Sequence, residues 1–205
     1  MKYIEILEKC RKSGFRLFTS AEFREMLGLT PASAKFLLIR YTARGVLVRL
    51  KRDLYALKDQ LPSTWAIANR LYKPSFVSME SGLSYYGMIP ESLYAVTSVT
   101  VKATRHFELS DVAYEYHTIK RDAFRSYRAA QISGETVLVA EREKALADYL
   151  YFAFLKKRTV NKRLRLKQVK KAVLEAHIRV YRNPKFLKWY RRQSIALRSR
   201  PLGQT

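Results

Sequence analysis

The residues from Thr19 to Leu57 constrain the fold of this chain more than any other stretch of its sequence. Within them, Thr30 followed by Pro31 predicts the start of a helix. A threonine hydroxyl can accept hydrogen bonds from the first backbone amides, and proline lacks an amide that would have no partner there. After this start, apolar residues recur at helical spacing, at Ala34, Leu37, Leu38 and Tyr41. The stretch therefore predicts a helix with one buried face.

A shorter helix and a β-hairpin are expected on either side of this helix. Ser20 is expected to cap the shorter helix, and Gly28 to form the turn between the two helices. Gly45 ends the second helix, and two β-rich runs follow at Val46–Leu50 and Leu54–Leu57. Two helices joined by a turn and followed by a hairpin predict a winged helix-turn-helix.

In a helix-turn-helix, the second helix enters the major groove of DNA, where its first residues meet the base edges. Here the candidate DNA-binding residues of that helix are Thr30, Ala32, Ser33, Lys35, Phe36 and Arg40. Lys35 suits a guanine or a phosphate, and Ser33 can donate or accept a hydrogen bond. From the connection between the two strands, Lys51 and Arg52 would reach backbone phosphate or the minor groove. The sequence therefore predicts binding to double-stranded DNA.

The sequence allows two interpretations of Phe36 in this helix. Phe36 and Ile39 lie outside the inward apolar stripe, so the helix is apolar on two sides. Phe36 could touch a thymine methyl group in the major groove. We favour the other reading, in which Phe36 packs against the preceding helix or a neighbouring domain.

The positive charge of the chain is concentrated at its two ends. The formal net charge of +23 divides into +7 for residues 1–60, zero for residues 61–155 and +16 for residues 156–205. Basic blocks of this kind are typical of proteins that bind polyanions, most often nucleic acids. We therefore predict an α+β protein in three parts: a winged helix-turn-helix at 1–60, a mixed α/β domain at 61–155 and a basic helical extension at 156–205.

The middle part shows both helical and strand patterns. A helix capped by Ser63 or Thr64 is expected to run to Leu71, and another is expected to start at Glu141. Runs rich in β-branched and aromatic residues predict three strands, at Val96–Val101, Val112–Ile119 and Thr136–Ala140.

The motifs of this middle part, taken in order, resemble those of the AbiEi family of antitoxins. The resemblance rests on FVSMESGLSYYGMIPE at 76–91, VTSVT at 96–100, the region of Phe107, YEYH at 114–117 and EREKALAD at 141–148, and with the preceding module it covers roughly residues 15–155. It implies a repressor that binds its own operon through the N-terminal module. It also implies an antitoxin of a type IV, abortive-infection system, which counteracts a nucleotidyltransferase toxin. The chain departs from the family in its basic tail, so it could instead act alone as a regulator.

An enzymatic interpretation finds few of the groups that it needs. There is no HExxH or CxxC spacing for a metal and no P-loop or GxGxxG motif, so we expect no metal site and no cofactor. The alternative is a metal-dependent DNA nuclease built from Glu141, Glu143 and Lys144, with Asp111 or Asp122 as a further carboxylate. Acidic residues in the first turn of a helix are the simpler explanation, because the helix dipole favours them there.

The tail carries candidate contacts to phosphate or to a partner. Two helices are expected in it, one with a stripe of Leu164, Val169, Val173 and Ala176, and one after Pro184 with Leu187 and Tyr190. The candidate contacts are Lys162, Arg163, Arg165, Lys167, Lys170, Lys171, Lys188, Arg191 and Arg192. We favour added contacts to DNA phosphates over an acidic toxin surface or RNA. The corresponding alternative function is an interaction protein whose basic tail binds RNA or an acidic partner.

Cellular location and assembly follow from weaker signals. Cys10 is the single cysteine, so no disulfide can form within the chain, which is typical of a cytoplasmic protein. We see no secretory signal and no apolar run near 18 residues, and so expect no membrane span. One recognition helix reads only a few base pairs, so we expect a homodimer or monomers that bind operator repeats cooperatively.

Overall fold

The computed structural model describes residues 8–10, 14, 16–90, 94–109 and 111–198. The chain forms two compact units, Met1–Tyr72 with Ile132–Glu135, and Lys73–Gln131 with Thr136–Thr205. Helices and strands occur in both units, so the predicted α+β class is confirmed.

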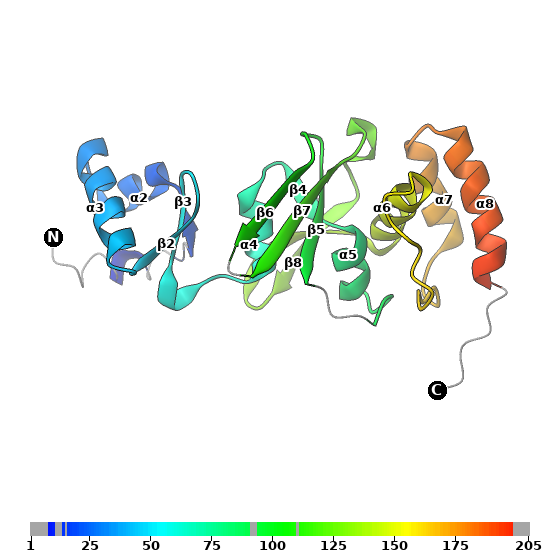
Figure 1. Cartoon of the computed structure of the whole chain (residues 1–205), viewed down its shortest axis with the longest axis horizontal. Coiled ribbons are helices and arrows are strands. Elements are labelled where there is room, and N and C mark those ends of the chain that lie inside the picture. Colours follow the sequence, from blue (N-terminus) through cyan, green and yellow to red (C-terminus); the bar gives the residue numbers. More distant parts are fainter. Residues whose placement is uncertain (1–7, 11–13, 15, 91–93, 110, 199–205) are drawn as a thin grey trace. The chain divides into compact units, whose positions relative to one another are not determined.

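The first unit includes a pair of helices and a three-stranded sheet (Figure 1), and a further helix follows them in the chain. In chain order its elements are β1 (Leu17–Phe18), α2 (Ser20–Leu27), α3 (Pro31–Ala43), β2 (Leu47–Lys51), β3 (Leu54–Leu57), the 3-10 turn η1 (Lys58–Gln60) and α4 (Thr64–Leu71). The strands lie in the order β1-β3-β2, and both pairs are antiparallel. The short strand β1 was not predicted.

The start of α2 differs from the prediction by one residue. Thr19, not Ser20, is the N-cap, and it forms a capping box with Glu22, in which each side chain bonds the backbone amide of the other residue. Ser20 is the first residue of the helix. The predicted turn is confirmed, because Gly28 follows the helix with a φ of 64°, a left-handed conformation that costs glycine little.

Helix α3 has the predicted start and the predicted buried face. The Thr30 hydroxyl accepts a hydrogen bond from the Ser33 amide at 3.2 Å, and Pro31 occupies the first helical position. Ala34, Leu38 and Tyr41 are buried, with Leu37 partly buried beside them. These residues share one core with buried side chains from β1, α2, β2 and β3 and with Cys10. The buried side chains of those elements include Phe18, Phe23, Leu27, Leu47 and Leu57.

The first unit extends beyond the predicted boundary at residue 60. Helix α4 has the predicted bounds, with Ser63 as its cap. The Arg70 guanidinium of α4 lies 2.6 Å from a carboxylate oxygen of Glu22 in α2. Arg70 and Glu22 therefore tie this helix to the first unit, whereas the sequence interpretation had placed it in the middle domain.

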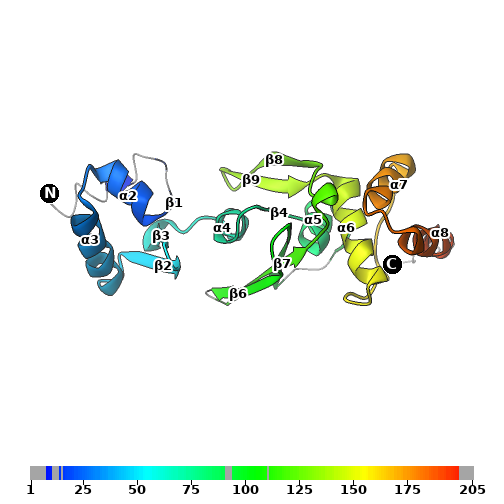
Figure 2. The same ribbon diagram turned by 90° about the horizontal axis from the view of Figure 1, so that it is seen from above.

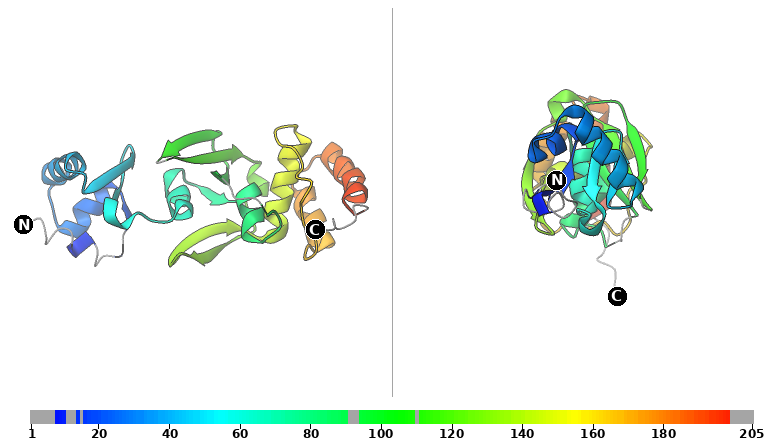
Figure 3. Two further views of the ribbon diagram at one scale, coloured as in Figure 1. Left: turned by 60° about the horizontal axis from the view of Figure 1, so that its bottom comes forward. Right: turned by 90° about the vertical axis from the view of Figure 1, so that its left-hand side faces the viewer.

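The second unit has a six-stranded mixed sheet in the order β6-β7-β5-β4-β9-β8. The strands are β4 (Ser75–Val77), β5 (Ala95–Thr100), β6 (Arg105–Leu109), β7 (Val112–Thr118), β8 (Tyr127–Ile132) and β9 (Glu135–Ala140). The three predicted strands correspond to β5, β7 and β9. The pairs β6–β7 and β8–β9 lie at opposite edges of the sheet (Figure 3). Strand β4 escaped prediction because it is short, and the edge strands β6 and β8 because polar residues interrupt them.

The helices of the second unit form two layers over this sheet. They are α5 (Met79–Tyr85), α6 (Arg142–Phe154), α7 (Lys171–Val180) and α8 (Pro184–Arg198), and a 3-10 turn, η2 (Arg121–Ala123), precedes β8. Helix α6 lies between the sheet and the helices α7 and α8 (Figure 2). The predicted helix after Glu141 is confirmed, with Glu141 as its N-cap.

Residues 156–205 were predicted to be a separate extension, but α7 and α8 belong to the core of the second unit. Their buried side chains are Leu174, Ile178, Phe186 and Tyr190, together with Tyr181 between the helices. The predicted stripe of Leu164, Val169, Val173 and Ala176 does not form one helix face. Leu164 and Val169 precede α7 and are partly buried against the core, whereas Val173 and Ala176 are exposed. Val173 is 38% exposed, and α7 begins only at Lys171.

A buried ion pair lies inside this second core. Lys144 and Asp148, one turn apart on α6, are both almost fully buried and form a salt bridge. Asp148 also accepts hydrogen bonds from the Tyr181 hydroxyl and, at 2.7 Å, from the Ser78 hydroxyl. The pair therefore joins α6 to the start of α5 and the end of α7.

Gly82 allows α5 and α6 to approach closely. A Cβ atom at this position would lie 2.8 Å from the Cβ of Ala145, closer than real Cβ contacts.

Among the described helices of the chain, none is long and apolar enough to span a bilayer.

Candidate nucleic-acid interface

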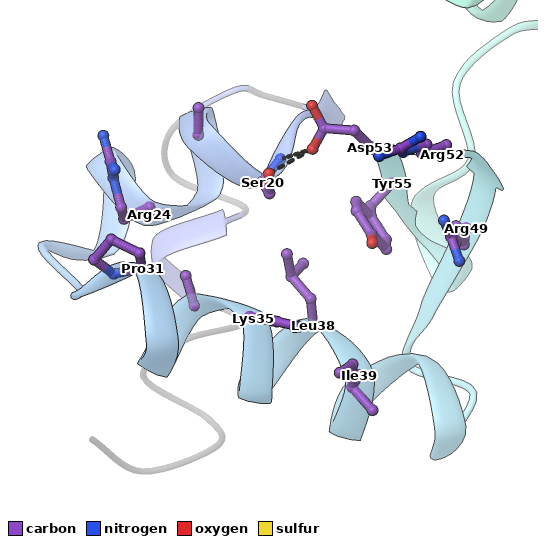
Figure 4. Close-up of a pocket in the computed structure, with 12 residues that line it drawn as sticks. Ser20, Arg24, Pro31, Lys35, Leu38, Ile39, Arg49, Arg52, Asp53 and Tyr55 are labelled. Carbon is purple, nitrogen blue, oxygen red and sulfur yellow. Dashed lines mark hydrogen bonds between the residues drawn. The ribbon is translucent and has the colours of Figure 1, made fainter.

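A groove in the first unit lies between α2, α3 and the β2–β3 hairpin (Figure 4). It encloses about 450 Å³ and is lined by Ser20, Ala21, Arg24, Pro31, Ala34, Lys35, Leu38, Ile39, Arg49, Arg52, Asp53 and Tyr55. Leu38 and Tyr55 point toward its middle, from α3 and from the hairpin. The groove thus has an apolar floor between the helix and the hairpin.

Four cations surround this apolar floor. Arg24 lies on α2, Lys35 on α3, and Arg49 and Arg52 on the hairpin, and all four side chains are exposed. Of the described residues that line the groove, Asp53 alone is acidic. The rim of the groove is therefore strongly electropositive, and a polyanion that approached it would meet cations from three elements.

Asp53 is engaged by α2. Its carboxylate accepts hydrogen bonds from the backbone amide of Ser20 at 2.9 Å and from the Ser20 hydroxyl at 2.5 Å. Asp53 has a φ of 60°, a left-handed conformation that Asp tolerates better than most residues. These hydrogen bonds hold the turn of the hairpin against the start of α2.

The predicted contact residues of α3 are accessible. All six, Thr30, Ala32, Ser33, Lys35, Phe36 and Arg40, are exposed. Phe36 is 62% exposed and Ile39 61% exposed, so the expectation that Phe36 packs against the preceding helix is wrong. The leading end and the outer face of this helix are open to a ligand.

The hairpin differs from the prediction in which of its cations are available. Lys51 lies within β2, and its ammonium donates a hydrogen bond to the backbone carbonyl of Leu71 at 2.5 Å. Lys51 therefore points toward α4 and does not line the groove. Arg52 lies in the turn as expected, and Arg49, not Lys51, is the second cation of the hairpin that lines the groove.

Arg24 and Arg49 were missed by the sequence interpretation. In a strand, side chains that point to one face recur every second residue, and the pairing of β2 shifts between Arg49 and Lys51. The shift turns Lys51 away from the face that alternation alone predicts. Arg24 stands in the last turn of α2, and only the packing of α2 on α3 brings it to the groove.

The nine candidate cations of the tail are all exposed and belong to the second unit. Five lie in the irregular segment before α7, and the others lie on α7 and α8. Arg165 and Lys167 line a pocket together with Arg142. The structure therefore distributes these cations over an irregular segment and two helices rather than gathering them on one helix.

The groups proposed for a nuclease do not converge. Lys144 is buried in its pair with Asp148, Asp122 pairs with Arg182 at 3.0 Å, and Glu143 accepts a hydrogen bond from the amide of Lys170 at 2.9 Å. Within the described part of the chain, no three His, Cys, Asp or Glu side chains gather at a position suited to a metal ion.

Cys10 is buried in the core of the first unit. Burial raises the pKa of its thiol to about 11, which disfavours the reactive thiolate.

Comparisons with known proteins add nothing to this geometry. No protein-family model matches the chain, and no curated protein matches it in sequence. The resemblance to the AbiEi antitoxins therefore rests on the motifs quoted from the sequence.

Proposed function

We propose that the first unit is a winged helix-turn-helix that binds double-stranded DNA, with α3 in the major groove and the β2–β3 hairpin as the wing. The observation that carries this proposal is the groove beside α3, whose rim brings together Arg24, Lys35, Arg49 and Arg52. The exposed first turn of α3 supports it further, because the first residues of a recognition helix contact base edges.

Each element has a distinct task in this proposal. Lys35 and Arg40 of α3 would contact guanine edges or flanking phosphates, and the exposed ring of Phe36 would meet a thymine methyl group. Arg52 at the turn of the hairpin would contact backbone phosphate or the minor groove. The bonds between Asp53 and Ser20 would keep the hairpin at a fixed distance from the helices.

We further propose that the protein is an autorepressor and a type IV antitoxin. The support for this role is the resemblance of residues 76–91 and 141–148 to the AbiEi antitoxins. The functional partner would be a nucleotidyltransferase toxin, with or without direct contact. Because one α3 per chain spans only a few base pairs, the operator would hold repeats that a dimer or cooperating monomers occupy.

Fluorescence anisotropy with the protein's own promoter tests DNA binding. We expect tighter binding to this duplex than to a scrambled one at about 150 mM salt, where phosphate contacts alone are weakened. Lys35→Gln with Arg40→Gln should remove most of that preference. The matched pair Lys170→Gln with Lys171→Gln should leave it. Equal affinity of the wild-type protein for the two duplexes would contradict the proposal.

Co-expression with a nucleotidyltransferase toxin from the same operon tests the antitoxin role. We expect the wild-type chain and the Lys35→Gln, Arg40→Gln variant to restore growth equally when both are expressed from a foreign promoter. A loss of rescue in this variant alone would mean that protection acts through DNA binding. No rescue by either protein would contradict the antitoxin role and leave DNA binding standing.

A further inference from the structure

The second unit holds a small basic pocket that the proposed DNA-binding groove does not include. It encloses about 190 Å³ between the end of α5, the start of α6 and the irregular segment before α7. Its lining residues are Tyr86, Gly87, Met88, Arg142, Arg165, Lys167, Gln168 and Val169. Three of them are cations, and none of the described lining residues is acidic.

Arg142 is held in place on one wall of this pocket. Its guanidinium lies 5.2 Å from the centre of the Tyr86 ring, and its Nη1 donates a hydrogen bond to the Gln168 carbonyl at 3.3 Å. The Tyr86 ring is itself fixed, because its hydroxyl donates to the Ala140 carbonyl at 3.0 Å. A guanidinium anchored in this way loses little entropy when it binds a ligand.

One polar atom of this guanidinium lacks a partner. The Nε of Arg142 is buried and has no hydrogen-bond acceptor among the described residues. A buried donor without an acceptor is costly, and a bound anion would satisfy it. The neighbouring Glu143 is not an acceptor for this Nε; its Oε1 accepts a hydrogen bond from the amide of Lys170 at 2.9 Å.

The opposite wall of the pocket is fastened to the same unit. The backbone amide of Arg165 donates to the carbonyl of Met88 at 2.7 Å, which ties the segment of Arg165 and Lys167 to the end of α5. The pocket thus brings together one fixed guanidinium and two further cations, although Arg142 and Arg165 lie far apart in the sequence.

We infer that this pocket binds a phosphate group. A planar guanidinium presents paired donors that match the oxygens of phosphate, and Arg165 and Lys167 supply further positive charge. The phosphate can belong to a free phosphorylated molecule or to the end of a nucleic acid strand. This inference does not depend on the proposed function, because every lining residue belongs to the second unit.

Isothermal titration of the full-length protein tests the inference. The probes are inorganic phosphate, adenosine 5′-monophosphate and a short single-stranded oligonucleotide with a 5′-phosphate. We expect saturable binding of inorganic phosphate at one site, weakened about tenfold or more by Arg142→Gln, because a charge-assisted hydrogen bond is lost. The control Lys185→Gln removes an exposed cation outside the pocket, and it should change the affinity less than twofold.

The variant Arg165→Gln with Lys167→Gln provides a second test if Arg142→Gln lowers the melting temperature, because both side chains are exposed. It should also weaken binding. Competition by the oligonucleotide would assign the phosphate to a nucleic acid end, and competition by the mononucleotide alone would assign it to a free molecule. Binding that fails to saturate, or that is equal in wild type, pocket variants and control, would overturn the inference.

Discussion

The carboxylate of Asp53 accepts two hydrogen bonds from Ser20, one from its backbone amide at 2.9 Å and one from its hydroxyl at 2.5 Å. The two residues are far apart in the sequence, and their contact closes one end of the groove between the helices and the hairpin (Figure 4). An acidic residue in a basic groove would ordinarily oppose DNA binding. Here one oxygen of the carboxylate, Oδ1, accepts both hydrogen bonds from Ser20 within the protein.

Replacing Asp53 should therefore destabilise the first unit. We expect Asp53→Ala to cost about 1–2 kcal/mol of unfolding free energy, because it removes both hydrogen bonds and places alanine in a left-handed conformation. Asp53→Asn should cost less, since asparagine keeps one acceptor and tolerates that conformation. Urea denaturation measures the difference. Equal stability of Asp53→Ala and wild type would show that the contact with Ser20 contributes nothing.

The salt dependence of DNA binding should identify the cations of the groove. Arg52→Gln should lower the magnitude of the slope of log K against log salt by about 0.9, the value for one lost phosphate contact on duplex DNA. Lys58→Gln is the matched control, because Lys58 is an exposed cation of the same unit that does not line the groove. Equal slopes for the two variants would show that Arg52 of the hairpin does not contact a DNA phosphate.

Two apolar residues of α3 should respond oppositely to truncation. Leu38→Ala should cost about 2–5 kcal/mol of unfolding free energy, because Leu38 is 3% exposed and alanine would leave a cavity. Phe36→Ala should change stability by no more than about 0.5 kcal/mol, because its ring is exposed. It should nevertheless weaken binding to the cognate duplex in the anisotropy assay. A large loss of stability in Phe36→Ala would assign the ring to internal packing instead.

The buried pair of Lys144 and Asp148 should show strong coupling in a double-mutant cycle. Lys144→Met alone should cost about 3–5 kcal/mol, because it leaves the Asp148 carboxylate buried without its cation. Lys144→Met with Asp148→Leu should recover part of this loss. Thermal and urea unfolding provide the measurement, and Lys188→Met serves as an exposed control. If the loss of unfolding free energy in the double variant equals the sum of the losses in Lys144→Met and Asp148→Leu alone, the two groups do not interact.

The unfolding free energy of the protein should fall in acid, in part because the Glu115 carboxylate becomes protonated. His117 lies 3.0 Å from its carboxylate, and this hydrogen bond, with the contribution of Arg158, outweighs burial and lowers the pKa of Glu115 from 4.5 to about 2. Because the pKa of Glu115 is lower in the folded state than in the unfolded state, its ionised carboxylate stabilises the folded state at every pH above the unfolded-state pKa. The contribution, about 1–2 kcal/mol after allowance for partial exposure, is therefore complete above pH 5 and is lost as the pH falls toward 2.

Glu115→Gln should flatten the pH dependence of the unfolding free energy between about pH 5 and pH 2. Glu108→Gln is the control, because Glu108 also lies near a histidine, His106, but its side chain is 79% exposed. Urea denaturation at a series of pH values measures both variants. Parallel curves for wild type and Glu115→Gln would show that this carboxylate does not contribute.

Several features of the candidate site could be predicted because they depend on neighbouring residues only. The cap at Thr30, the turn at Gly28 and the buried face of α3 follow from hydrogen bonds and spacings within a few residues. The exposure of Phe36 could not be predicted. An apolar residue outside the main stripe can equally face another element or solvent, and the sequence does not say which elements are present on that side.

Other residues are buried by the tertiary structure, without any signal in the neighbouring sequence. Lys144 and Asp148 look like exposed helix charges, but the sheet, α5 and α7 cover them and their mutual pairing offsets the loss of water. Likewise, the basic composition of the tail predicted an extension, whereas Tyr181 and Phe186 anchor it in the core.

The sequence by itself determined where α3 begins, where α2 ends and where positive charge accumulates, because capping, backbone conformation and formal charge are properties of neighbouring residues. Only the tertiary structure decided which cations share a groove with α3 and which are diverted, as Lys51 is to the carbonyl of Leu71. The reason is that a side chain's direction and its partners depend on strand register and on packing between segments distant in the chain.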